Sequence, residues 1–310
     1  MKEKIAVRSG SSFWGQIRKS IFLYLMFLPV LFYYIVFKYL PMFGLVIAFK
    51  DYNAFVGIAK SPWVGFKYFG QFLNSMHFGR LIRNTLAISL LDLLVNFPAP
   101  IILALMLNEV RVKKFKRIIQ TVSYLPHFVS TVIIVGIYVN FLSLSTGLVN
   151  NILELLGFAR IHFLAEPGYF WGLFTGMNIW RTIGWSSIIY IAALSGVDPT
   201  LYEAAVVDGA GKWRQLFSVT LPALVPTIIT LFIMRVGHIL DVGYEAIILM
   251  YNPQIYDTAD VISTYVYRRG MIQADYSFAS AVGMFQSVIG MVMVIGANTL
   301  SKKFTETSIW

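Results

Sequence analysis

Two groups of polar and aromatic residues interrupt long apolar stretches, and each group recurs at helical spacing. The first group lies at i, i+3, i+4 and i+7: Asn178, Arg181, Thr182 and Trp185. The second group repeats this spacing further along the chain: Arg235, His238, Asp241, Val242 and Glu245. Side chains at these intervals share one face of an α-helix. Amide, guanidinium and indole groups on one face can hydrogen-bond to and stack on a polar ligand, so both groups are candidates to line a binding cavity.

The charged members of the second group also allow a purely structural interpretation. A charge at bilayer mid-depth costs about 2.5–3.5 kcal/mol on insertion scales, so it usually faces a cavity or a partner. Arg235, Asp241 and Glu245 can equally neutralise one another or pair with a neighbouring subunit. The sequence leaves both interpretations open for this group and favours a cavity role for the first. Asp92 and His127 can also line the path, but residues of this kind more often serve packing or interhelical hydrogen bonds.

The sequence contains no pattern typical of catalysis. It has no cysteine, which excludes disulfides, thiolate metal sites and cysteine nucleophiles, and no His/Glu cluster or Ser/His/Asp arrangement is present. A phosphate-binding P-loop requires G-x-x-x-x-G-K-[ST], whereas Gly211-Lys212 is followed by Trp213 and position 206 is Val. The chain is therefore expected to be no enzyme, with no catalytic residue, no metal site and no bound cofactor.

The composition supplies the apolar elements that must position these residues. Of the 310 residues, 57% are hydrophobic and 13% are charged, with a mean hydropathy of +0.69, whereas soluble domains carry about 25% charged residues. Apolar runs long enough to cross a bilayer, about 20 residues, predict an all-α integral membrane protein with six transmembrane helices. The predicted spans are residues 20–40, 85–107, 118–142, 170–196, 222–250 and 276–300.

Basic residues indicate how these spans are oriented. Five of them lie within residues 111–117, and dense Lys and Arg favour the cytoplasmic side, so both termini are predicted to be cytoplasmic. The same tendency explains the net charge of +10 without a nucleic-acid partner. The chain then divides into a cytoplasmic segment 1–19, a transmembrane domain 20–300 and a cytoplasmic tail 301–310. Residues 147–158 predict a short external amphipathic helix, which either lies on the surface or contacts a partner.

The polar loop between the fourth and fifth spans, residues 198–222, predicts two short helices joined by a turn. Asp198 can cap the first helix with Pro199 at its first position. Thr200 and Glu203 offer a capping box instead, and the sequence does not choose between them.

Gly209, after Asp208, is expected to break the first helix because glycine accepts positive φ without steric conflict. The second helix places Trp213, Leu216 and Phe217 on one apolar ridge, and Leu221-Pro222 is expected to end it. Such a ridge fits either a groove on another protein or the lipid interface; its physical chemistry alone does not decide.

The spacing of this loop resembles a known motif. Glu203-Ala204-Ala205, followed at fixed distances by Gly209 and Val219-Thr220-Leu221-Pro222, resembles the EAA motif of binding-protein-dependent ABC importer permeases. Asp208-Gly209-Ala210 and Trp213 are typical of the sugar-importing branch, and Val219 replaces the usual isoleucine. The order of spans fits as well, so the resemblance extends over about residues 15–310. The segments 41–45 and 49–53 resemble permeases for oligosaccharides and polysaccharide fragments.

The resemblance implies a type I ABC importer permease fold, with cytoplasmic termini, in the bacterial cytoplasmic membrane. The loop would form a coupling helix that docks on an ATPase through these residues: Glu203, Ala204, Ala205, Asp208, Gly209, Trp213, Phe217, Leu221 and Pro222. The two groups of polar residues on the neighbouring spans would bind a carbohydrate. Arg181 suggests that this sugar carries a uronate.

The resemblance also implies partners within the lipid bilayer and on both sides of it. These are a second permease subunit of different sequence, two cytoplasmic ABC ATPases that bind ATP and Mg, and an extracytoplasmic solute-binding protein. Transport would then proceed by alternating access. The alternative is an ion-coupled secondary transporter with Asp241 and Glu245 as carriers. Such a transporter would be expected to show an inverted repeat, which is not visible, and it leaves the loop unexplained.

Overall fold

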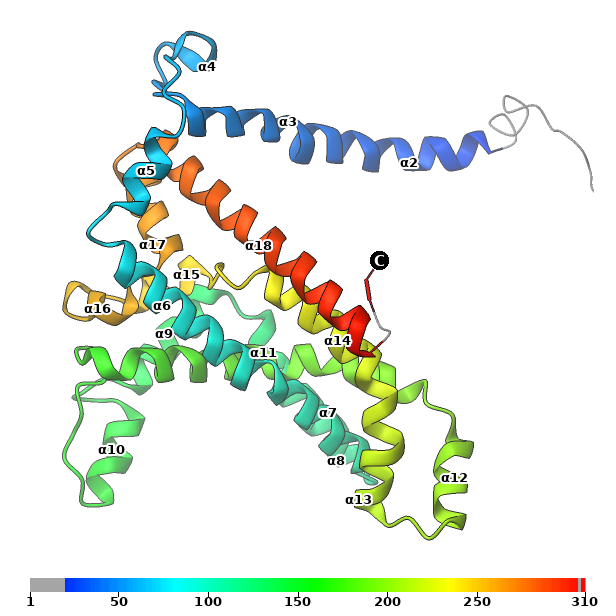
Figure 1. The fold of residues 1–310 in the computed structure, drawn as a ribbon. Coiled ribbons are helices and arrows are strands. Elements are labelled where there is room, and N and C mark those ends of the chain that lie inside the picture. Colours follow the sequence, from blue (N-terminus) through cyan, green and yellow to red (C-terminus); the bar gives the residue numbers. More distant parts are fainter. Residues whose placement is uncertain (1–19, 306–307, 310) are drawn as a thin grey trace, which may run out of the picture.

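The computed structural model describes residues 20–305 and 308–309, and these are helical almost throughout (Figure 1). Within this described part, the one β-type pairing is an isolated bridge between Lys50 and Trp63. The all-α prediction is therefore confirmed for these residues. The predicted N-terminal segment 1–19 lies outside them, and so do three residues of the predicted C-terminal tail.

Four helical stretches are long and apolar enough to cross a membrane: Ile21–Phe49, Phe78–Glu109, Lys212–Gly237 and Tyr276–Lys303. A fifth candidate is a bent pair of helices, Lys113–Phe128 and Thr131–Phe141. The remaining predicted span coincides with α11 (Phe170–Ser195), which has 26 residues but is not among these apolar candidates. The count of six spans and the orientation of the termini therefore stay predictions.

Prolines account for a change of helical geometry in three of these stretches. The π-helical segments η1 (Ile35–Tyr39), η3 (Asp92–Asn96) and η6 (Leu216–Thr220) each end two residues before a proline: Pro41, Pro98 and Pro222. Proline lacks an N–H, and its ring clashes with the carbonyl four residues earlier. A widened turn relieves this conflict, so the chain continues as a helix. The flanking elements are α2 (Ile21–Tyr34), α3 (Leu40–Met42), 3₁₀ η2 (Phe43–Phe49), α6 (Phe78–Leu91), α7 (Pro98–Glu109), α13 (Lys212–Gln215) and α14 (Leu221–Gly237).

The predicted span 118–142 is bent sharply. It comprises α8 (Lys113–Tyr124), the 3₁₀ turn η4 (Leu125–Phe128) and α9 (Thr131–Phe141), whose two helical parts meet at 107°. Pro126 lies in η4, and the backbone at Val129 and Ser130 is extended, which turns the chain. The side chain of Ser130 then caps α9. The predicted span therefore contains a bend, which the apolar run conceals.

The predicted span 222–250 is also interrupted. α14 ends at Gly237, and α15 (Tyr244–Met250) begins only after a non-helical segment. Gly237 packs closely on α18 (Tyr276–Thr305), since a Cβ on Gly290 would lie 2.5 Å from its carbonyl oxygen. Gly243 has φ +76°, which ordinary side chains rarely adopt. The prediction of one continuous helix was therefore wrong, and the two glycines mark the break.

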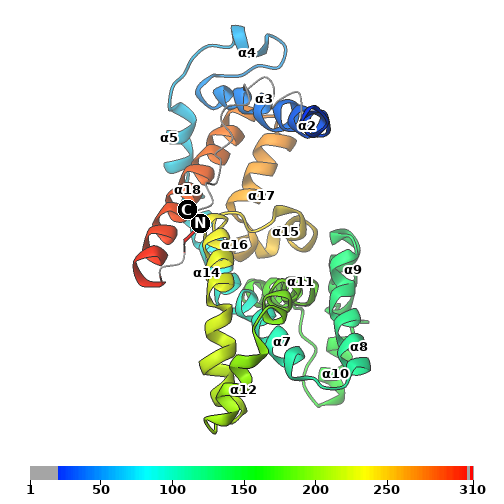
Figure 2. The same cartoon turned by 90° about the vertical axis from the view of Figure 1, so that its right-hand side faces the viewer.

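α11 is the central helix of the fold, with α7, α8 and α14 packed against it (Figures 1 and 2). One buried cluster joins α7, α11 and α14 through Ala104, Tyr190, Leu194 and Leu224. A second surrounds Phe170 and Phe174, and a third joins α5, α6, α17 and α18. The remaining elements are α4 (Gly57–Lys60), α5 (Lys67–Leu73), α10 (Leu148–Leu155), η5 (Pro167–Tyr169), α12 (Pro199–Val207), η7 (Pro253–Ile255), α16 (Tyr256–Ala259), α17 (Ile262–Tyr267) and η8 (Arg268–Ile272). α10 confirms the predicted short helix within residues 147–158.

The N-terminal helical stretch stands apart from the rest of the chain. Figure 1 shows α2 extending away from the body, to which the stretch is joined at its C-terminal end. α2 buries none of its residues, whereas Ala48 in η2 is buried beside α18.

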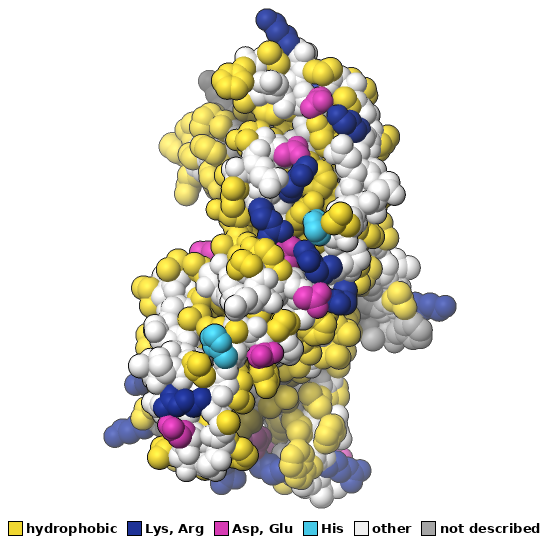
Figure 3. All heavy atoms as spheres, turned by 90° about the vertical axis from the view of Figure 1, so that its left-hand side faces the viewer, with side chains coloured by type: hydrophobic (Ala, Val, Ile, Leu, Met, Phe, Trp, Pro, Cys, Tyr) yellow, Lys and Arg dark blue, Asp and Glu magenta, His cyan; other side chains and the backbone are white. Residues whose placement is uncertain are grey.

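The face that carries α5, α6 and α16 has acidic and basic side chains interspersed among apolar ones (Figure 3).

Candidate functional site

The loop 198–222 forms the predicted first helix, α12. The structure shows which of the two expected caps, Asp198 or the Thr200–Glu203 capping box, begins this helix. Asp198 is the N-cap residue and accepts a hydrogen bond from the backbone N–H of Thr200 at 2.9 Å, with Pro199 at the first helical position. Hydrogen bonds from the backbone and the hydroxyl of Thr200 lower the pKa of Asp198. Asp198 is thus the cap, and Glu203 is left exposed on the helix surface.

Gly209 provides the turn that ends α12. Its φ is +75°, and its N–H donates to the carbonyl of Val206 at 3.0 Å. The N–H of Ala210 donates to the carbonyl of Ala205 at 2.8 Å, so the last carbonyls of the helix are satisfied as in a helix C-cap. Ala204, Asp208 and Gly209 are exposed, and Ala205 is half-buried.

The apolar ridge of the second helix projects from the protein. Trp213 is 76% exposed and Phe217 is 64% exposed, so together they offer an apolar surface that a partner or lipid can cover. The expectation that Leu221-Pro222 ends this helix was wrong, because the π-helical η6 accommodates Pro222. One helical stretch, Lys212–Gly237, therefore runs from the ridge into the apolar body, with Pro222 exposed and Leu221 half-buried.

One contact anchors the loop to the body, and two more join its own parts. Lys212 forms an ion pair with Glu109, at the end of α7, at 3.0 Å. The hydroxyl groups of Tyr202 and Thr220 lie 3.1 Å apart, and Gln215 donates to the carbonyl of Ala210 at 2.8 Å. These contacts fix the orientation of α12 relative to the helix that leaves the loop.

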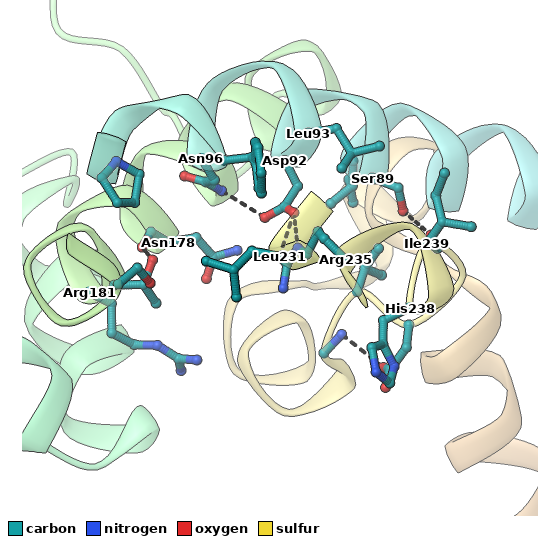
Figure 4. A pocket seen from close by; sticks show the side chains of 18 of the residues that line it. Ser89, Asp92, Leu93, Asn96, Asn178, Arg181, Leu231, Arg235, His238 and Ile239 are labelled. Atoms are coloured by element: carbon teal, nitrogen blue, oxygen red, sulfur yellow. Dashed lines mark hydrogen bonds and ion pairs between the residues drawn. The ribbon is translucent and has the colours of Figure 1, made fainter. Parts of the chain in front are cut away.

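A cavity of about 540 Å³ lies among α6, η3, α11, α14 and the segment that follows α14. The whole first group lines it: Asn178, Arg181, Thr182 and Trp185. His238, Asp241 and Val242 of the second group line it as well, together with Arg235, whereas Glu245 does not. Figure 4 shows Asn178 and Arg181 on one side and Arg235 and His238 on the other.

The second group reaches the cavity in a way that the sequence did not predict. Because α14 ends at Gly237, its members do not share one helical face. Arg235 lies in the last turn of α14, His238 and Asp241 lie in the segment beyond it, and exposed Glu245 lies in the first turn of α15. The regular spacing in the sequence was therefore coincidental, although four of the five residues line the cavity.

Arg235 pairs with Asp92, for which the sequence allowed a place along the path, packing or an interhelical hydrogen bond. Its guanidinium lies 2.5 Å from the carboxylate of Asp92, so it is not neutralised by Asp241 or Glu245 as one expectation held. The second oxygen of Asp92 accepts a hydrogen bond from Asn96 at 3.1 Å. The spacing Asp92-x-x-x-Asn96, just before Pro98, is the feature of the sequence that could have indicated this site.

Arg181 and Trp185 are held differently. Arg181 donates to the hydroxyl of Thr131 at 3.1 Å, so the partner of its guanidinium is neutral. The indole of Trp185 stacks on the ring of His127, with ring centroids 4.6 Å apart and the planes 4° from parallel. Trp185 remains 43% exposed. The cavity therefore combines an available guanidinium with a supported aromatic surface.

Comparison with known proteins identifies the family. Residues 96–305 match the family described as binding-protein-dependent transport system inner membrane component. The chain belongs to this family. Two relatives come from Bacillus subtilis strain 168. Protein LplB is 46% identical over 97% of this chain and 95% of that protein. The polygalacturonan/rhamnogalacturonan transport system permease protein YteP is 45% identical over 93% of this chain and 90% of that protein.

Solved structures agree with this assignment. A chain of a bacterial alginate ABC transporter, crystallised with an alginate pentasaccharide-bound periplasmic protein, is 46% identical and has a TM-score of 0.88. The match covers 96% of this permease and all of that chain. A second structure, of an ABC transporter involved in alginate import, is 47% identical with a TM-score of 0.87. The protein is thus a multi-pass membrane permease of an ABC transport system, and it is not itself a catalytic enzyme.

Proposed function

We propose that this permease is one of two transmembrane subunits of an ATP-driven importer for an acidic oligosaccharide. The observation that carries the proposal is the helical stretch Lys212–Gly237, which joins an exposed apolar ridge at one end to a polar cavity at the other. A docking ridge and a ligand cavity on one helix suit a protein that couples an external energy source to transport.

The carbohydrate is inferred from the relatives and from the cavity. The names of the relatives and structures concern polygalacturonan, rhamnogalacturonan and alginate, which are acidic polysaccharides. A pyranose offers an apolar face and a rim of hydroxyls, which suit Trp185 and Asn178. Arg181, whose partner is a neutral hydroxyl, suits a carboxylate. These features together favour a uronate-containing oligosaccharide over a neutral one.

The ATPase partner follows from the loop. The sequence has no P-loop, so two separate cytoplasmic ATPases bind ATP and Mg, and the ridge of Trp213 and Phe217 fills a groove on one of them. Glu203 lies exposed beside the ridge and can make a polar contact there. Closure of the ATPases moves the coupling loop, and the cavity then alternates between outward and inward access.

A second permease and a binding protein complete the assembly. α2 is apolar and buries no residue against its own chain, which suits packing against a second, different permease as well as lipid. The related alginate transporter was crystallised with a periplasmic protein, and a similar protein would deliver the sugar here. The bacterial cytoplasmic membrane and cytoplasmic termini fit this arrangement.

The ion-coupled alternative has less support. It needs Asp241 and Glu245 together in the transport path, but Glu245 does not line the cavity. The family match, the relative YteP and the alginate transporter chain all belong to binding-protein-dependent or ABC transport systems or are named as transport-system permeases.

Co-purification tests the coupling role. The variant Trp213→Ala with Phe217→Ala should lose the co-expressed ATPase, whereas Leu155→Ala on α10, the truncation of an even more exposed apolar side chain, should retain it. Retention of the ATPase by the loop variant would refute docking through this ridge.

Uptake tests the substrate class. An alginate trisaccharide and its carboxyl-reduced counterpart have the same length and linkages and differ in charge. Arg181→Gln should lower import of the acidic sugar more than import of the reduced one. Equal losses would remove the proposal that Arg181 recognises a carboxylate.

A further inference from the structure

Two ion pairs join the same two helical stretches, Phe78–Glu109 and Lys212–Gly237. Lys212 pairs with Glu109 beside the coupling loop at 3.0 Å, and Arg235 pairs with Asp92 in the cavity at 2.5 Å. The chain runs from Lys212 to Arg235 along one stretch, while their partners run back from Glu109 to Asp92 along the other. The two stretches are therefore antiparallel. Any sliding of Lys212–Gly237 along its partner must disturb both ion pairs.

The two members of the cavity pair are held unequally. Asp92 opens the π-helical η3, its side chain is only 14% exposed, and Asn96 binds its second oxygen. The side chain of Arg235 is 52% exposed and points into the cavity from the last turn of α14 (Figure 4). Asp92 is therefore the fixed member, and Arg235 is the member that can change partner.

The pairing decides which positive charges a ligand meets. Four lining residues carry a full charge: Asp92, Arg181, Arg235 and Asp241. Asp92 neutralises Arg235, while Arg181 binds a neutral hydroxyl. An anionic ligand in this conformation therefore meets one available guanidinium. If Arg235 left Asp92, the ligand would meet two, in a low-dielectric site where charge-assisted hydrogen bonds are strong.

The coupling loop has a direct mechanical connection to this pair. Trp213 and Arg235 lie near opposite ends of one helical stretch, about 33 Å apart at roughly 1.5 Å per residue. A displacement of a few ångströms at the loop, carried along this helix, is sufficient to separate two groups that must stay within hydrogen-bonding distance.

We infer that Asp92 is a specificity switch that masks Arg235 in the conformation seen here and exposes it to the substrate carboxylate when the coupling helix moves. The inference rests on the proposed function, import of an acidic sugar. In one state Arg235 and Arg181 both bind the substrate. In the other state, Asp92 pairs with Arg235 again, which weakens binding of the substrate and favours its release.

Equilibrium binding to the purified importer, which contains both permease subunits and the ATPases, tests this switch. Affinities for an alginate trisaccharide and its carboxyl-reduced counterpart are measured without nucleotide and after trapping with ATP and vanadate. The variants are Asp92→Asn, Arg235→Gln and the two combined. Arg83→Gln is the matched control. Arg83 forms an ion pair with Asp257, at 3.1 Å, and neither residue lines the cavity.

Wild type should bind the acidic trisaccharide about tenfold more tightly in one state than in the other, the size expected for a hydrogen-bonded charge. Asp92→Asn should bind it tightly in both states, and Arg235→Gln weakly in both. The combined variant should match Arg235→Gln, and the control should keep the state dependence of wild type.

The inference is overturned if Asp92→Asn keeps the state dependence, or if the reduced sugar changes in parallel with the acidic one. A wild-type complex that binds neither trisaccharide would instead refute the proposed function. Wild type that prefers the acidic sugar equally in both states would refute the switch alone.

Discussion

The turn at Gly209 allows the coupling role to be tested by changing one backbone angle. Gly209 has φ +75°, and a Cβ there would meet no atom within 4 Å. The effect of adding a side chain at Gly209 is therefore determined by backbone strain at positive φ, and not by steric overlap with neighbouring atoms. Gly211, two residues later, has φ −68° and equally open surroundings. The two glycines differ mainly in backbone conformation, which makes Gly211 a matched control.

The size of the effect follows from the left-handed conformation. An ordinary residue there is disfavoured by roughly 1–2 kcal/mol, and Asn is tolerated better. If the whole strain opposes the docking-competent turn, the population of that turn falls about 5–30-fold, at about 1.4 kcal/mol for each factor of ten. We expect Gly209→Asn to have a small effect, Gly209→Ala a larger one and Gly209→Val the largest, since a β-branched residue is least compatible with positive φ.

The assay is the ratio of sugar imported to ATP hydrolysed in proteoliposomes that contain the complete importer. Gly209→Val should lower this ratio while the protein still inserts into the membrane, and Gly211→Val should leave it near the wild-type value. If both variants transport alike, or if Gly209→Asn is as impaired as Gly209→Val, the turn does not act through its backbone geometry.

Three further predictions concern packing, capping and the loop anchor. Gly184→Ala should destabilise the protein by about 1–3 kcal/mol, because a Cβ would overlap the backbone of α8. Gly172→Ala on the same helix meets no atom within 4 Å and should be neutral or slightly stabilising in thermal unfolding in detergent. Asp198→Ala should raise hydrogen exchange in α12. Because hydrogen bonding lowers the pKa of Asp198, wild-type protection should be present above the usual carboxyl pKa and lost as the pH falls through the lowered one. Glu109→Lys should lower transport by breaking the ion pair with Lys212 that anchors the loop, and Glu109→Lys combined with Lys212→Glu, which restores an ion pair, should recover it.

The loop was predictable from the sequence because its determinants are local. A capping aspartate, a proline at the first helical position and a glycine at the turn act within a few residues of one another. The structure confirms Asp198 as the cap and Gly209 at positive φ. The one local error was at Pro222, where a widened turn lets the helix continue. The sequence marks where a proline lies, but not whether the preceding turn can widen.

The cavity was less predictable because contacts between distant segments decide it. Asp92 and Arg235 are 143 positions apart, and neither residue indicates the other in the sequence. Periodicity correctly placed the first group on α11, an uninterrupted helix. It failed for the second group because apolar residues continue through the break after Gly237, and hydropathy does not register a backbone turn.

That break itself identifies the cavity, by an argument from backbone hydrogen bonds. Non-helical backbone at membrane depth is tolerated where it is buried in protein or lines a polar cavity, since its freed carbonyls need donors. The donors are present: the Ser89 hydroxyl bonds the carbonyl of Ile239, and the Gln286 amide bonds that of Leu240 at 2.8 Å. α6 and α18 thus supply hydrogen-bond donors for backbone carbonyls that no longer have helical partners beyond Gly237. The chain can therefore end α14 at Gly237 and direct His238 and Asp241 toward the cavity from the segment beyond it.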